Sequence, residues 1–181
     1  MSMKNEVLDL LAARRSCRSF QPDQLSKDTL ALIVEAGRRA PSAMNRQQCH
    51  FYVITDPAWL ERITNTVSQR LEGAAGRDCR YGAPALVVVT GRRDNGCALQ
   101  DAACAMENMM LSAAALGVGS CWINQLFHLR EDEEMIALLA EMGVSKEEFP
   151  CASLSLGLPA GPLFPGQREL TGCPVTWLEE K

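Results

Sequence analysis

Three arginines and a serine lie within five residues of one another near the start of this chain, in the run Arg14-Arg15-Ser16-Cys17-Arg18. Arginine presents a planar fork of N–H donors and keeps its positive charge near neutral pH, so such a group suits a phosphate monoester. The three arginines cannot all lie on one face of a helix, so the chain must turn here if they are to converge. The same residues also fit a simpler role as the basic end of a first helix.

A second polar segment, Pro-Ser-Ala-Met-Asn-Arg-Gln at 41–47, offers a turn at Pro41, a hydroxyl at Ser42 and carboxamides at Asn45 and Gln47. A carboxamide both donates and accepts hydrogen bonds, so a pair of them can bind the mixed polar edge of a planar heterocycle. An ordinary turn between a helix and a strand contains the same residue types. The segment alone therefore leaves both interpretations open.

Apolar spacing predicts the elements that must position these groups. Helices are predicted over about 3–14, from a cap at Ser26 to Pro41, from just after Pro57 to about 71, over about 99–116 and over 131–142. Strands are predicted over 51–54, which we expect to be buried, and over 86–89, 118–123 and 152–156. The helix over 99–116 is apolar almost all round, so we expect its own sheet and a partner subunit to cover it. Helices and strands interleave without strict βαβ regularity, which favours an α+β fold.

The chain has 181 residues, 47% of them hydrophobic, and a formal net charge of −4. This composition predicts one globular domain over 1–181, with an extended tail from about 158 to 181 after a Pro/Gly-rich stretch. The negative charge argues against nucleic acid and anionic membranes as partners. No apolar run approaches the roughly 20 residues that span a bilayer, and the N-terminus reads as an amphipathic helix rather than a signal peptide. We therefore expect a cytoplasmic protein with no membrane partner.

The eight cysteines contain no Cys-x-x-Cys pair, and the chain has only two histidines. Zinc and iron–sulfur sites usually show tighter ligand spacing, so we expect no metal. Most of these cysteines have apolar neighbours and are predicted to be small, reduced hydrophobic residues. A cysteine nucleophile is not expected, because neither histidine has a recognisable partner.

Taken together, Arg-Arg-Ser-x-Arg-x-Phe at 14–20 and Pro-Ser-x-x-Asn-x-Gln at 41–47 closely resemble the signature of the FMN-dependent nitroreductase family. Tyr-Gly-Ala-Pro at 81–84, the helix from Asp101 to Leu116 and Gly-Val-Gly-Ser-Cys-Trp-Ile-Asn at 117–124 also look like segments of this family, in the family's order. The resemblance covers roughly residues 4–170. It implies a nitroreductase-like α+β fold, with a central mixed or antiparallel sheet flanked by helices.

For the phosphate end of the cofactor, the resemblance implies that Arg14, Arg15 and Ser16 hold the FMN phosphate and ribityl chain. Arg18 matches a basic position near flavin N1 and O2, where negative charge gathers on reduction. Arg168 matches a C-terminal basic residue that returns to the phosphate.

For the ring end, the matching residues are Pro41, Ser42, Asn45, Gln47, Trp122, Ile123 and Asn124. The first four belong to the loop that borders the ring, and the last three belong to the segment that passes the N5 edge. No catalytic side chain is implied, because the flavin carries the chemistry.

The activity implied is reduction of a small-molecule electron acceptor, such as a nitro compound or a quinone, in a ping-pong cycle with NADH or NADPH as the transient hydride donor. Gly117-x-Gly119 lacks the third glycine and the acidic partner of a dinucleotide fingerprint, so the nicotinamide nucleotide is expected to bind as a passing substrate. The family places its flavin at the interface of an intertwined homodimer. Gln48 and Cys49 stand where the family often has Pro-Trp, and Gly166 stands where it is often basic. A flavin-binding carrier or sensor without turnover is the alternative.

Overall fold

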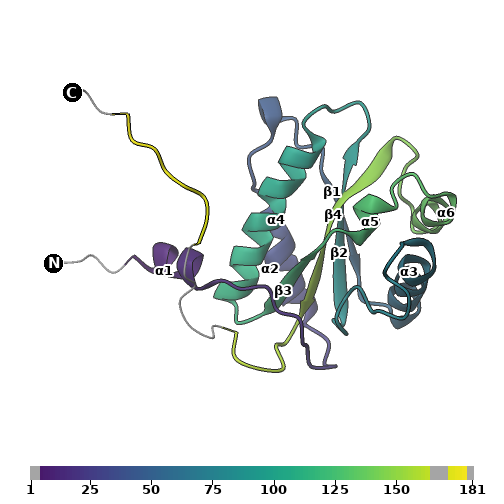
Figure 1. The fold of residues 1–181 in the computed structure, drawn as a ribbon, viewed down its shortest axis with the longest axis horizontal. Coiled ribbons are helices and arrows are strands. Elements are labelled where there is room, and N and C mark those ends of the chain that lie inside the picture. The colour runs from purple at the N-terminus through teal and green to yellow at the C-terminus, as the bar shows by residue number, and fades with distance from the viewer. Residues whose placement is uncertain (1–4, 164–170, 179–181) are drawn as a thin grey trace.

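The computed structural model describes residues 5–163 and 171–178. A four-stranded antiparallel sheet, in the order β1-β2-β4-β3, lies between two layers of helices (Figure 1). Its strands are β1 (His50–Ile54), β2 (Ala85–Arg92), β3 (Gly119–Ile123) and β4 (Glu148–Gly157). The predicted α+β fold is therefore confirmed, and every pairing in the sheet is antiparallel.

One face of the sheet is covered by α2 (Lys27–Arg38) and α4 (Ala98–Ala115), and the other by α3 (Pro57–Arg70), α5 (Gln125–His128) and α6 (Glu133–Glu141). A short helix, α1 (Glu6–Ala13), packs against α4, and a 3-10 turn, η1 (Ala43–Asn45), lies between α2 and β1. No helix among the residues placed in the structure is long and apolar enough to cross a membrane.

The central strand β2 explains the run Leu-Val-Val-Val at 86–89. Val87 and Val89 belong to the core under α2 and α4, while Leu86 and Val88 belong to the core under the other helix layer. Because successive side chains point to opposite faces, a strand covered on both sides is apolar throughout. The prediction of a strand here is confirmed, and the strand extends to Arg92.

Helix caps also follow the sequence closely. The Ser26 hydroxyl accepts a hydrogen bond from the Thr29 N–H, as predicted for the start of α2. In α3, Asp56 is the cap and Pro57 is the first helical residue, so the helix begins at Pro57 rather than after it.

The expectation that the strand over 51–54 is buried is wrong. β1 pairs with β2 alone and lies at the edge of the sheet, so only Ile54 is buried and Val53 is 44% exposed. An apolar run cannot by itself distinguish an edge strand from a central one. The short helix α5 was not predicted, because four residues are too few to show a helical period.

The start of α6 gives a pH-dependent prediction. Asp132 caps this helix by accepting from the Glu134 and Met135 N–H groups, and its carboxylate also accepts a 2.9 Å hydrogen bond from Arg70 on α3. The bond from Arg70 is the main reason that the pKa of Asp132 lies below its usual value. A carboxyl with a lowered folded pKa stabilises the fold above its unfolded pKa, near 3.9, and this contribution is lost as pH falls.

We therefore expect Asp132→Asn, which keeps a capping side chain, to lower the free energy of unfolding at pH 6. The difference from wild type should shrink toward pH 2.5, as measured by urea denaturation. Arg70→Gln should remove the same pH-dependent contribution to the free energy of unfolding. A difference in the free energy of unfolding between variant and wild type that stays constant from pH 6 to pH 2.5 would contradict this account.

Candidate cofactor site

The arginine-rich segment after α1 runs alongside β3 and α4. The Cys17 N–H donates a 2.8 Å hydrogen bond to the Ser120 carbonyl on β3. Arg14 lies 3.6 Å from the Glu107 carboxylate on α4, and its side chain is 23% exposed. A Cβ at Gly119 would lie only 2.8 Å from the Cys17 sulfur, so the segment can approach β3 this closely because residue 119 is glycine.

The arginines in this segment have different surroundings. Arg15 donates to the carbonyls of Ala12, Ala13 and Arg14, at 2.8, 3.0 and 2.7 Å. Arg15 thus caps the end of α1, which is the simpler role that the sequence left open. Arg18 is exposed, and its guanidinium carbon lies 5.9 Å from the centre of the Tyr81 ring. The structure therefore brings together the segments at 14–18, 81–84 and 119–123.

The loop over 41–47 contains hydrogen bonds between its own residues. The Ser42 hydroxyl accepts from the Gln47 N–H at 2.9 Å, and the Gln47 amide donates to the Asn45 Oδ1 at 2.8 Å. Met44, Asn45 and Gln47 have φ values of 52°, 53° and 53°, in the left-handed region. This conformation costs residues other than glycine about 1 kcal/mol or more each, so the surroundings must hold it in place.

The arginine segment and the loop contact different parts of α4. Arg14 reaches Glu107, whereas the Ala43 N–H in the loop donates to Asp101 in the first turn of the helix. Six residues correspond to about 9 Å along a helix axis. Figure 1 shows α1 beside the lower part of α4 and the loop after α2 at its upper end.

The three residues after Cys121 are placed differently from one another. The Trp122 side chain is 36% exposed, whereas Ile123 is buried between the sheet and the second helix layer. The Asn124 amide lies 3.3 Å from Nε2 of His128, one turn along α5. Trp122 and Asn124 can offer side chains to a ligand, and Ile123 can offer only its backbone. The predicted phosphate contact Arg168 lies outside the described residues.

Comparison with known proteins decides the family, since a model of the nitroreductase family matches residues 11–158. The chain belongs to the nitroreductase family. It is 32% identical over 156 residues to an Archaeoglobus fulgidus protein provisionally named NADH dehydrogenase/NAD(P)H nitroreductase, covering 85% of this chain and 86% of that protein.

Solved structures agree with this assignment. A Bacteroides fragilis nitroreductase with bound FMN is 34% identical to this nitroreductase-family chain, with a TM-score of 0.89, covering 97% of this chain and all of the other. A Desulfitobacterium hafniense nitroreductase with bound FMN has a TM-score of 0.85 at 24% identity, covering 98% of this chain and 100% of the other, and shows the fold alone.

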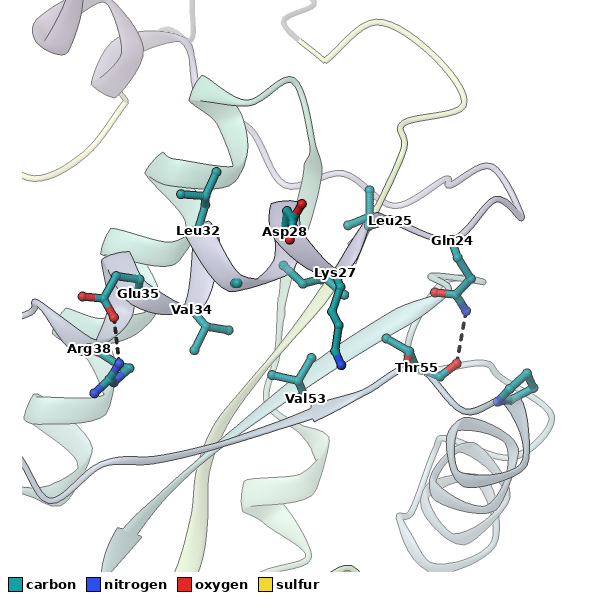
Figure 2. A pocket seen from close by; sticks show the side chains of 13 residues that line it. Gln24, Leu25, Lys27, Asp28, Leu32, Val34, Glu35, Arg38, Val53 and Thr55 are labelled. Atoms are coloured by element: carbon teal, nitrogen blue, oxygen red, sulfur yellow. Dashed lines mark hydrogen bonds and ion pairs between the residues drawn. The ribbon is translucent and has the colours of Figure 1, made fainter.

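Two of the hollows in the described part of this nitroreductase-family chain border α2, and neither includes a residue of the arginine segment. Figure 2 shows the larger, a groove of about 1110 Å³ between α2 and β1, with Leu32, Val34 and Val53 among its apolar residues. Among the predicted cofactor residues that the structure describes, none lines this groove. A smaller hollow of about 370 Å³ lies behind the loop and includes Ser42 and Gln47.

The cysteines are free thiols, and several are buried. Burial is the main reason that the pKa of Cys49 is raised to about 11 and that of Cys151 to about 12. Both thiols are therefore protonated at neutral pH and unsuited to nucleophilic attack. Within residues 5–163 and 171–178, no three His, Cys, Asp or Glu side chains are grouped so that they could hold a metal.

Two carboxylates beside the candidate site were not singled out from the sequence. Asp101 and Glu107 lie on one helix, and each contacts one of the two polar segments. The available signal was a charged residue in a helix that is otherwise apolar, since such a residue is rarely buried without a partner.

Proposed function

We propose that this nitroreductase-family chain is a single-domain FMN-dependent oxidoreductase. It would use NADH or NADPH to reduce a nitro compound, a quinone or a similar acceptor in two half-reactions. The observation that carries the proposal is the position of the segment at 14–18 beside β3, with Arg14 near α4 and Arg18 near Tyr81, in a chain 34% identical to an FMN-bound nitroreductase. FMN supplies the redox chemistry when bound, by accepting a hydride equivalent and passing electrons to the acceptor.

The side chains present fit a phosphate monoester. The Arg14–Glu107 contact of 3.6 Å is longer than a hydrogen bond, so the Arg14 guanidinium keeps donors for an anion. Ser16 is exposed between Arg15 and Arg18 and can donate its hydroxyl proton. Arg15 would contribute positive charge from its position at the end of α1. We keep Arg168 as a further phosphate contact.

On the ring side, we propose that Pro41, Ser42, Asn45 and Gln47 border the isoalloxazine. The Ser42 oxygen and the Asn45 Oδ1 already accept bonds inside the loop, so the Ser42 hydroxyl hydrogen and the Asn45 NH2 group are the groups that can donate to a ligand. Trp122, the backbone of Ile123, and Asn124 would pass the N5 edge.

We also propose that the working form is an intertwined homodimer. The two polar segments are held at different points of α4, this helix exposes Leu99 and Cys104, and Leu116 at its C-cap is exposed as well. Val175, Trp177 and Leu178 in the tail are exposed as well, and the groove beside the edge strand β1 is apolar. A second copy would cover these surfaces. A solution mass of two chains by light scattering is the check.

The decisive experiment is the visible spectrum of the purified protein before and after anaerobic addition of NADH or NADPH. Flavin bands that bleach on addition would support FMN binding and the reductive half-reaction. Bands that do not bleach would favour a carrier or sensor without turnover. A colourless protein that does not take up added FMN would overturn the cofactor assignment.

Arg18 gives a prediction on the redox potential. A positive charge near the part of the flavin that becomes negative on reduction favours the reduced form. Arg18→Ala should therefore keep FMN but lower its midpoint potential by about 30 mV, the two-electron equivalent of about 1.4 kcal/mol. Spectroelectrochemical titration measures this, with Arg62→Ala on α3 as the control. A potential equal to that of wild type would refute the role of Arg18.

A further inference from the structure

A buried carboxylate on α4 binds the backbone of the loop over 41–47. Asp101 is 5% exposed, and its Oδ1 accepts a 2.8 Å hydrogen bond from the Ala43 N–H. Its Oδ2 accepts a 3.1 Å bond from the Asn95 amide. Both carboxylate oxygens thus have a partner, and one of the partners is the backbone of the loop.

Asn95 in turn has a fixed orientation. It is buried, and its Oδ1 accepts from the Cys97 N–H at 3.0 Å and from the Arg46 guanidinium at 3.5 Å. Because the oxygen faces these two donors, the NH2 group faces Asp101. The loop is therefore linked to the start of α4 at two points, through Ala43 and through Arg46.

The loop needs such external support. Three of its residues have left-handed backbone conformations, and none of them is glycine. The side-chain oxygen of Asn45, one of the three, accepts from Gln47, which leaves the NH2 group to donate, and Met44 is 77% exposed. Asn45 is exposed in the conformation that is held, so its N–H groups can reach a ligand.

We propose that Asp101 is a positioning residue of the cofactor site, which acts through the Ala43 N–H to hold Asn45 toward the flavin ring. This inference rests on the proposed function for its second half, the effect on FMN. Its first half, the support of the loop, concerns the chain alone. The two halves can therefore be tested separately.

The first test uses the protein without flavin. Asp101→Asn is nearly isosteric but can accept only one of the two hydrogen bonds, and its NH2 group then faces a second donor. Loss of one buried hydrogen bond corresponds to about a tenfold change in an opening equilibrium. Trypsin cleavage after the exposed Arg46 should accelerate by about that factor, with cleavage after Arg62 in α3 as the internal reference. Gln100→Ala, the exposed neighbour on α4, is the matched control.

The second test is a double-mutant cycle on FMN affinity and midpoint potential, with Asp101→Asn and Asn45→Ala. If Asp101 acts through Asn45, Asp101→Asn should weaken FMN by about tenfold in the wild-type background and have little further effect in Asn45→Ala. A merely structural role of Asp101 would give additive losses of FMN affinity and leave the midpoint potential of the bound flavin unchanged.

The outcomes separate the two proposals. Cleavage after Arg46 within twofold of wild type would overturn the support of the loop by Asp101. Additive effects in a protein that binds FMN would overturn the positioning role and leave the proposed function standing. A wild-type chain that takes up no FMN would overturn the proposed function and the flavin half of this inference, whereas accelerated cleavage would still establish the support of the loop.

Discussion

Arg14→Gln is expected to weaken FMN binding by about 30- to 150-fold. Arg14 follows α1 and faces Glu107 on α4, but the two side chains are too far apart for a hydrogen bond. Hydrogen bonds from a charged donor to a charged acceptor contribute about 2–3 kcal/mol, which corresponds to this loss. Fluorescence titration of the apoprotein with FMN measures it, and riboflavin, which lacks the phosphate, should bind both proteins with similar affinity.

Glu107→Gln is the matched control, because it removes the same ion pair from the other side. If Arg14 serves the phosphate, removing the Glu107 charge should leave FMN binding unchanged or make it tighter. If Arg14 only holds α1 against α4, the two variants should weaken binding equally. Equal losses would therefore contradict the assignment of Arg14 to the phosphate.

Gly157→Ala is expected to lower the free energy of unfolding by about 1–3 kcal/mol, the usual cost of overpacking. At the end of β4, a Cβ on Gly157 would lie 2.7 Å from the Pro84 ring and 3.0 Å from the Phe20 ring. The proline ring cannot rotate away, so Phe20 or the strand end must move. For a chain of this size, the change corresponds to a fall in Tm of about 2–4 °C per kcal/mol.

Gly161→Ala is the control for this change, because nothing lies within 4 Å of the Cβ it would add. Phe20 forms a bridge with Pro159 and ends the segment that carries Arg18. Gly157→Ala should therefore also weaken FMN binding, since its clash is relieved at Phe20. Calorimetry and FMN titration of both variants test this, and equal Tm values for the two would contradict it.

The sequence predicted the elements whose signals are local. The helix cap at Ser26 and the β-branched run at 86–89 can be predicted without information about the rest of the chain. The start of β4 was placed too late, at residue 152 instead of Glu148, because Pro150 interrupts the strand pattern. In the structure, the register shift between Val89 and Thr90 lies opposite this proline and lets the strand continue.

The features of the candidate site also fall into those that depend on local sequence and those that depend on packing between distant segments. The positive charge of residues 14–18 and the turn at 41–47 are local properties and were visible in the sequence. That Arg15 caps its own helix, or that Asp101 reaches Ala43 across 58 positions, depends on how helices pack. No pattern of residue types within one segment contains that information.

Cys104 is exposed on α4, three residues after Asp101 and three before Glu107, so it lies one helical turn from each of the two carboxylates that contact the polar segments. The protein therefore carries a native attachment point for a thiol-directed fluorophore midway between the two halves of its site. With the other exposed thiol, Cys173, replaced by serine, a dye at Cys104 would test the proposed cofactor uptake and the proposed association of two copies in real time, with no residue added to the chain.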